Sequence, residues 1–148
     1  PLGVLFFLAA HIIYLLAYDN YLSDIIPDHP FLAPWEIGVI LFGMLLYLLV
    51  FIFTKTKFSV FMIPLSVYVF VLMLMCLRAL TLACLQTSFH PAFSVALSIG
   101  AIFFLLSDTS LGLLMFNKKC KANFPLKIFN IATYFIGQLL LAITILFR

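Results

Sequence analysis

Long apolar runs separated by short polar segments make up nearly the whole chain. A membrane-spanning helix needs about 20 consecutive apolar residues, and five runs approach or exceed that length. The five predicted helices are Leu2–Tyr18, Trp35–Phe53, Phe58–Gln86, Pro91–Phe116 and Phe124–Phe147. The pattern therefore predicts an all-α, polytopic membrane helix bundle that forms a single transmembrane domain over residues 1–148.

The connections between these runs are short, with one exception. Asp19–Pro34 contains aspartates, an asparagine and three prolines, which is typical of an irregular loop. Trp35 follows this loop directly and suits the membrane–water interface. Pro91 suits the first turn of the fourth helix, where a proline leaves no helical hydrogen bond unmade.

Composition supports a membrane protein. Of 148 residues, 66% are hydrophobic and 9% are charged, and the mean hydropathy is +1.28, whereas soluble domains average about 25% charged residues. The three cysteines show no CxxC or Cys/His ligand spacing, so neither a metal site nor a disulfide framework is predicted. The chain begins at Pro1 within an apolar run, which favours a fragment whose upstream helices are missing.

Charges in the connections predict the orientation of the helices. The basic residues after the second and fourth helices would all lie on one side, and the positive-inside rule makes that side cytoplasmic. The acidic residues after the first helix would then lie on the opposite side. The net charge of +3 thus reflects topology, and nothing indicates a nucleic-acid partner. The basic residues are Lys55, Lys57, Lys118, Lys119, Lys121 and Lys127, and the acidic ones are Asp19, Asp24 and Asp28.

Asp108 is the most informative residue because it lies deep in an otherwise apolar helix. A carboxylate at the centre of a membrane helix costs at least ~2.5–3.5 kcal/mol on insertion scales, and such residues usually face a protein interior or a watery cavity. We interpret Asp108 as functional. The alternative is a hydrogen bond between helices that only stabilises the bundle.

Other polar residues in the spans fall at a similar depth. Counting ~1.5 Å per residue from the predicted cytoplasmic ends places His11, Tyr68, Asp108 and Tyr134 all at ~12–15 Å. Tyr14 and Gln138 lie one turn from two of them on the same helix faces. We predict that these four side chains share one cavity, although each could instead serve packing or a hydrogen bond between helices.

Arg78 lies nearer the outer end of its helix, where its long side chain could snorkel to the interface. The chemistry of the predicted layer centres on Asp108, because a carboxyl group in an apolar site favours its neutral, proton-donating form. His11 could orient that acid or activate water. The residues alone fit hydrolysis, proton or cation transport through Asp108 and His11, or a non-catalytic membrane component.

Four stretches in order along the chain resemble the YhhN-like membrane family, which includes the lysoplasmalogenases. The most specific is Gly100-Ala-Ile-Phe-Phe-Leu-Leu-Ser107-Asp108. The others are Gly3 to Tyr14, Pro64 through Tyr68 to Arg78, and Tyr134-Phe-Ile-Gly-Gln138. The resemblance implies eight spans, of which this chain supplies the last five, and a second key aspartate in a Gly-Asp pair on an earlier helix.

The resemblance also implies an activity, which is hydrolysis of the vinyl ether bond of a lysoplasmalogen to a fatty aldehyde and a glycerophospho-alcohol. Asp108 would act as the general acid with His11 beside it, and the supporting residues would be Tyr14, Tyr68, Arg78, Ser107, Tyr134 and Gln138. No metal or other cofactor is required. The expected partners are a lysophospholipid substrate, membrane lipid and the missing N-terminal helices, in a bacterial cell membrane rather than a eukaryotic internal one.

Overall fold

The computed structural model describes residues 2–27, 30, 32–53, 62–117 and 120–147, and in these ranges it contains helices and no strand. The order of elements along the chain is α1 (Leu2–Ile25), α2 (Pro34–Phe53), α3 (Met62–Gln86), α4 (Pro91–Phe116), α5 (Phe124–Ile143) and a short 3-10 helix, η1 (Thr144–Phe147). Within the described residues, four helices are long and apolar enough to cross a membrane, and α2 contributes a shorter apolar stretch over Pro34–Val50. The all-α class predicted from the apolar runs is therefore confirmed.

One predicted helix end is wrong. The first helix continues to Ile25 instead of ending at Tyr18, so Asp19 and Asp24 are helical residues and not loop residues. The hydroxyl of Ser23 donates to the main-chain oxygen of Asp19, and the helix ends shortly before Pro27. The predicted end of the fifth span at Phe147 agrees with the structure, although its last turn from Thr144 has 3-10 geometry and the Thr144 hydroxyl donates to the carbonyl oxygen of Leu141.

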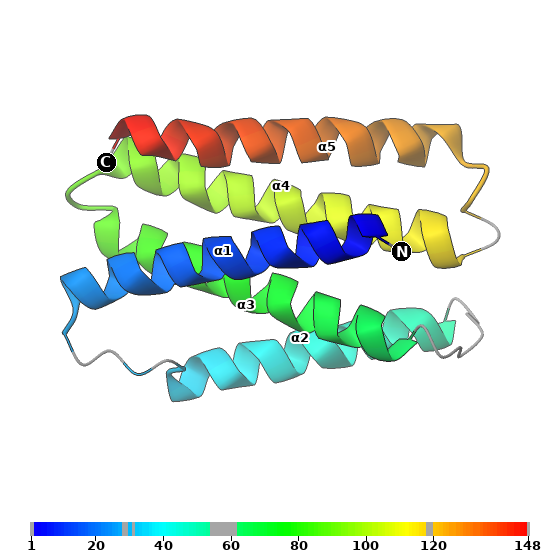
Figure 1. The fold of residues 1–148 in the computed structure, drawn as a ribbon, viewed down its shortest axis with the longest axis horizontal. Helices are drawn as coiled ribbons and strands as arrows, with labels where there is room; N and C mark the ends of the chain where they lie inside the picture. The colour runs from blue at the N-terminus through cyan, green and yellow to red at the C-terminus, as the bar shows by residue number, and fades with distance from the viewer. Residues whose placement is uncertain (1, 28–29, 31, 54–61, 118–119, 148) are drawn as a thin grey trace. The chain divides into compact units, whose positions relative to one another are not determined.

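The chain divides into two compact units, which we call the first unit (Pro1–Arg78) and the second unit (Ala79–Arg148). In the first unit, α1 and the larger part of α3 run parallel (Figure 1). Two contacts show this direction: His11 contacts Tyr68, and further along both helices Asp19 pairs with Arg78. Glu36, at the start of α2, also pairs with Arg78, so α2 runs antiparallel to α3.

In the second unit, α4 and α5 run antiparallel and approach closely at two glycines (Figure 1). A Cβ atom on Gly137 would lie 3.1 Å from the main-chain nitrogen of Phe104 and 3.2 Å from the carbonyl oxygen of Gly100. A Cβ atom on Gly100 would lie 3.0 Å from Leu141. Small residues at such crossings let the main chains of membrane helices touch.

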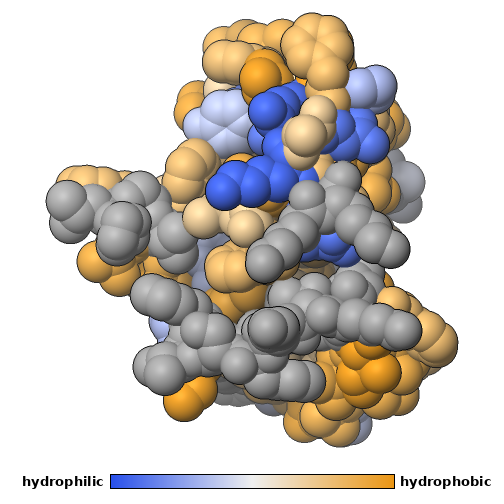
Figure 2. Space-filling model, turned by 90° about the vertical axis from the view of Figure 1, so that its right-hand side faces the viewer, coloured by the Kyte–Doolittle hydropathy of each residue, from blue (hydrophilic) through white to orange (hydrophobic). Residues whose placement is uncertain are grey.

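The surface of the helices is largely apolar. Large hydrophobic side chains are exposed along every helix, and on α2 they include Ile37, Leu41, Phe42 and Leu45. The connection between α4 and α5 is polar, since Lys121 and Asn123 are exposed there and Lys127 is exposed just inside α5. Figure 2 shows hydrophilic surface beside apolar surface at this end of the helices. This distribution fits helices surrounded by lipid with a polar connection outside it.

The residues on which the predicted orientation depends are only partly described. Lys121 and Lys127 are exposed, as the prediction requires, but Lys55, Lys57, Lys118, Lys119 and Asp28 lie outside the described residues. Asp24 is exposed at the end of α1. The cytoplasmic assignment of the basic connections stays a prediction.

Candidate functional site

Arg78 on α3 is the centre of a buried ionic cluster in the first unit. Its Nη1 lies 3.4 Å from Oε1 of Glu36 on α2, and its Nη2 lies 3.3 Å from Oδ1 of Asp19 on α1. Nη2 also donates to the main-chain oxygen of Pro30 at 3.3 Å. The Arg78 side chain is 1% exposed, Glu36 is 0% exposed and Asp19 is 29% exposed. We call these three side chains the Arg78 cluster.

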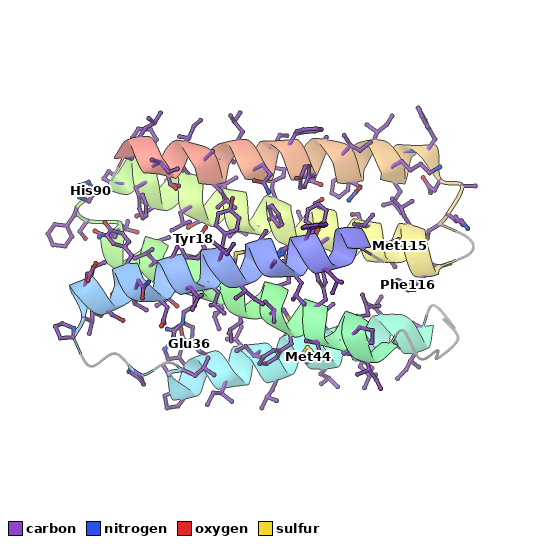
Figure 3. The ribbon with its side chains drawn as sticks, in the orientation of Figure 1. Tyr18, Glu36, Met44, His90, Met115 and Phe116 are labelled. Carbon is purple, nitrogen blue, oxygen red and sulfur yellow. The ribbon has the colours of Figure 1, made fainter. Side chains whose placement is uncertain are left out.

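Glu36 reaches this cluster because it lies in the first turn of α2. Pro34 is the first residue of α2, and Oε2 of Glu36 accepts a hydrogen bond from the main-chain N–H of Ala33 at 2.8 Å. A glutamate at the third helical position commonly reaches back in this way. One carboxylate oxygen therefore caps α2 while the other faces Arg78, and Figure 3 shows Glu36 at the first turn of the helix.

The snorkelling predicted for Arg78 is wrong. The guanidinium group is buried between two carboxylates from different helices. Both Asp19 and Arg78 lie within the limits of candidate spans, Leu5–Ile25 and Ile63–Gln86. Charges within spans are rare and usually pair with one another, and Glu36 and Asp19 provide such partners for Arg78.

His11 and Tyr68 are brought together in the first unit. Their ring centroids are 5.4 Å apart with an interplanar angle of 70°, and His11 is 1% exposed. Nδ1 of His11 hydrogen-bonds to the carbonyl oxygen of Phe7, one turn earlier on α1. A carbonyl oxygen only accepts, so Nδ1 carries the hydrogen and Nε2 is the acceptor nitrogen of the neutral ring. That tautomer suits a base.

Tyr14 lies on α1, half-buried, and its ring stacks on Tyr18 with the centroids 6.1 Å apart. The stack follows from the spacing of four residues, which places both side chains on one helix face. Tyr14 thus contributes an aromatic surface to the first unit.

Asp108 lies on α4 in the second unit, and its side chain is buried, with 8% exposed. The buried face of α4 carries Leu97, Ala101 and Phe104 at helical spacing before it. Asp108 is the only acidic residue in the sequence from Ala79 to Arg148, and α4 itself contains no Lys or Arg. The structure therefore places this carboxyl group on the inner face of its helix, as predicted.

Ser107 and Asn130 join α4 to α5 beside Asp108. Nδ2 of Asn130 donates to the carbonyl oxygen of Ser107 at 2.7 Å and to its hydroxyl oxygen at 3.1 Å. The hydroxyl of Ser107 donates in return to the carbonyl oxygen of Asn130 at 3.2 Å. We call this arrangement the Ser107–Asn130 pair. Ser107 is 1% exposed, so the pair is a buried and neutral polar contact.

Tyr134 and Gln138 follow Asn130 on one face of α5 at intervals of four residues. The Tyr134 ring packs against Phe104, with the centroids 5.9 Å apart. Phe104 precedes Asp108 by one helical turn, so Tyr134 lies about one turn from the level of the carboxyl group. Gln138 is half-buried.

The predicted site residues thus fall into two sets. His11, Tyr14, Tyr68 and Arg78 lie in the first unit, and Ser107, Asp108, Tyr134 and Gln138 lie in the second. The pairing of His11 with Tyr68 is present, whereas the single cavity predicted for all four layer residues stays a prediction. Among the described residues, no group of three or more His, Cys, Asp or Glu side chains is placed to hold a metal ion.

Three polar residues of these networks were not predicted, namely Asp19, Glu36 and Asn130. Glu36 had a signal in the sequence, because it is the third residue of a helix that begins with proline. Asn130 had one too, because it continues the Tyr134 and Gln138 face by one turn. Asp19 had none, since aspartate beside asparagine and prolines is typical of a loop.

Comparison with known proteins agrees with the resemblance found in the sequence. The profile of the YhhN family matches residues 1–145. No curated protein and no solved structure gives a significant match. The family match covers α1 to α5, including the Asp108 region of α4. The chain therefore belongs to the YhhN family.

Proposed function

We propose that this chain provides the acid-bearing part of a membrane-embedded hydrolase that cleaves the vinyl ether bond of lysoplasmalogens. The YhhN family includes lysoplasmalogenases, and the family match extends over residues 1–145. The observation that carries the proposal is the buried Asp108 on the inner face of α4, in the second unit where it is the only acidic residue.

The reaction needs an acid that protonates carbon. A proton from Asp108 adds to the vinyl carbon farther from the ether oxygen, and the other vinyl carbon becomes part of an oxocarbenium ion. Water adds to that carbon and loses a proton, which gives a hemiacetal. The hemiacetal collapses to a fatty aldehyde and the glycerophospho-alcohol. One water is consumed, and the proton that it loses to the base returns to Asp108 through solvent, which restores the acid.

A buried carboxylic acid suits the first step. In its protonated form, a carboxyl group at this position can act as a general acid toward the vinyl carbon. After the transfer, the Asp108 carboxylate is an anion beside the cationic intermediate and stabilises it electrostatically. One positioned acid of this kind contributes ~10²–10⁴-fold to a rate.

The second step needs a group that accepts a proton from water. The resemblance implies two candidates, which are the second aspartate on an earlier helix and His11. His11 has the tautomer that this role requires, since its Nδ1 is used by the Phe7 carbonyl oxygen. Tyr68 packs against the imidazole ring and restricts the rotation of that ring. The single alkenyl chain of the substrate would enter from lipid along the apolar helix surfaces.

The proposal is tested with the purified protein in detergent or lipid. It should release aldehyde from an alkenyl lysophospholipid but not from the saturated alkyl ether of the same head group, which cannot be protonated at carbon. In D2O the aldehyde should carry one deuterium at the carbon next to the carbonyl. Absence of aldehyde, together with proton or cation flux in vesicles that requires Asp108, would instead support the transport alternative.

A further inference from the structure

Asn130 makes all of its side-chain contacts described above with the residue that precedes Asp108. Its amide group donates to both oxygen atoms of Ser107, at 2.7 and 3.1 Å, and the Ser107 hydroxyl donates back to the Asn130 carbonyl oxygen at 3.2 Å. Three hydrogen bonds thus join one residue of α4 to one residue of α5. A contact with this many directional bonds fixes where Ser107 points.

Fixing Ser107 also fixes Asp108. Successive residues of an α-helix are separated by about 100° around the axis. When Ser107 is held against α5, Asp108 can only lie about a quarter-turn away, on the face where Ala101 and Phe104 are buried. Thr109, the next residue, is exposed. A modest rotation of α4 would therefore exchange a buried carboxyl group for an exposed one.

Two other described contacts between α4 and α5 constrain the rotation of α4 less directionally. Gly100 and Gly137 allow close approach of the two main chains, and the Phe104–Tyr134 contact is a tilted packing of rings. Such contacts are non-directional and tolerate small rotations. Hydrogen bonds weaken steeply as their angles depart from linear, so the Ser107–Asn130 pair is a directional element of this interface.

We propose that Asn130 is a positioning residue that sets the rotation of α4 and so aims the Asp108 carboxyl group inward. The inference rests on the proposed hydrolase function, because it assigns Asn130 a role through the acid of that reaction. Asn130 itself has no part in proton transfer. Its carboxamide hydrogen-bonds to Ser107, and the position of Ser107 determines the direction of Asp108 on the same helix.

The direct test measures the direction of residue 108 without any reaction. In a protein whose native cysteines are replaced, Asp108→Cys and Thr109→Cys are made separately and labelled in lipid vesicles with a lipid-soluble maleimide. With Asn130 present, position 109 should react several-fold faster than position 108. In the Asn130→Leu background, which keeps the size of the side chain but removes its donors, the two rates should approach each other.

Turnover gives the second readout, and a matched control accompanies it. Asn130→Leu should lower kcat by about 10- to 100-fold, since small displacements of a catalytic group have effects of this size, and should leave KM nearly unchanged. Ser110→Ala is the control. Ser110 is also buried on α4, but its hydroxyl donates to the Leu106 carbonyl oxygen of its own helix, so kcat should hold. Asn130→Gln keeps the carboxamide and should recover part of the loss.

The outcomes separate the two proposals. A labelling ratio that does not change in Asn130→Leu overturns the positioning role, whatever happens to turnover. Loss of kcat in Ser110→Ala equal to that in Asn130→Leu also overturns it, because any buried hydroxyl would then be equivalent. A wild-type protein that releases no aldehyde contradicts the hydrolase, and labelling still decides whether Asn130 sets the direction of residue 108. If Asn130→Leu does not fold, the same ratio is measured in Asn130→Ala.

Discussion

The two units of the chain bury their polar groups in different ways. In the first unit, Arg78 lies between the carboxylates of Glu36 and Asp19, so two helices are joined to α3 by charge. In the second unit, α4 and α5 are joined by the neutral Ser107–Asn130 pair, and Asp108 beside it is the only acidic residue. The Arg78 cluster thus holds three helices together, whereas the Ser107–Asn130 pair sets the direction of the neighbouring Asp108 side chain.

The energies of the two networks should differ accordingly. Removing one partner of a buried ion pair typically costs 3–5 kcal/mol, because a charge is left without compensation. A polar contact between membrane helices averages about 0.6 kcal/mol and reaches about 1.7 kcal/mol. We therefore expect the Arg78 cluster to govern stability, and the Ser107–Asn130 pair to govern the direction of Asp108 at little cost in stability.

The largest expected effect on stability is that of Arg78→Gln. This change leaves Glu36, which is 0% exposed, without its cation, and we expect the free energy of unfolding to fall by about 3–5 kcal/mol. Titration with a denaturing detergent measures it. The triple variant Asp19→Asn, Glu36→Gln, Arg78→Met removes all three charges together and should recover most of the loss. A triple variant as unstable as Arg78→Gln would contradict the charge argument.

A smaller loss is expected for Asn130→Leu. The main-chain oxygen of Asn130 still accepts from Ser107 in this variant, so only the bonds donated by the carboxamide disappear. The free energy of unfolding should fall by about 0.6–1.7 kcal/mol in the same titration. A loss as large as that of Arg78→Gln would remove the distinction between the two networks.

Asp19→Asn should have the smallest effect on stability. The Asp19 side chain is 29% exposed, and Arg78 keeps Glu36 as its partner. Partly exposed ion pairs contribute about 0–1 kcal/mol, so the loss should stay below that of Asn130→Leu or match it. A collapse of the fold in Asp19→Asn would show that Glu36 alone does not hold Arg78.

The side of the membrane that the connection between α4 and α5 faces can be tested independently of stability. Cys120 is partly exposed in the connection between α4 and α5, which the basic residues predict to be cytoplasmic. A membrane-impermeant maleimide should therefore label Cys120 from the cytoplasmic side of oriented vesicles only. Labelling of Cys120→Ser provides the background, and labelling from the opposite side would reverse the predicted topology.

Much of the fold could be predicted from the sequence because apolar runs report on helices directly. The end of α1 could not, since Asp19 and Asp24 are typical of a loop and become helical residues beside a distant arginine. Pairing of Arg78 with Asp19 and Glu36 joins three separate helices, and no local pattern contains that information. The sequence did place Asp108 on an inner face, whereas the role of Asn130 depends on its contact with Ser107 of another helix, which a pattern within α5 does not contain.

The central claim is that Asp108 supplies the proton, and turnover of Asp108→Asn tests it most directly. Asparagine keeps the size of the side chain and its ability to hydrogen-bond but has no carboxylic proton. With alkenyl lysophospholipid in detergent micelles, aldehyde release should fall by about 10²–10⁴-fold, while the free energy of unfolding stays close to that of the wild type. A stable Asp108→Asn protein that releases aldehyde at the wild-type rate would contradict the account.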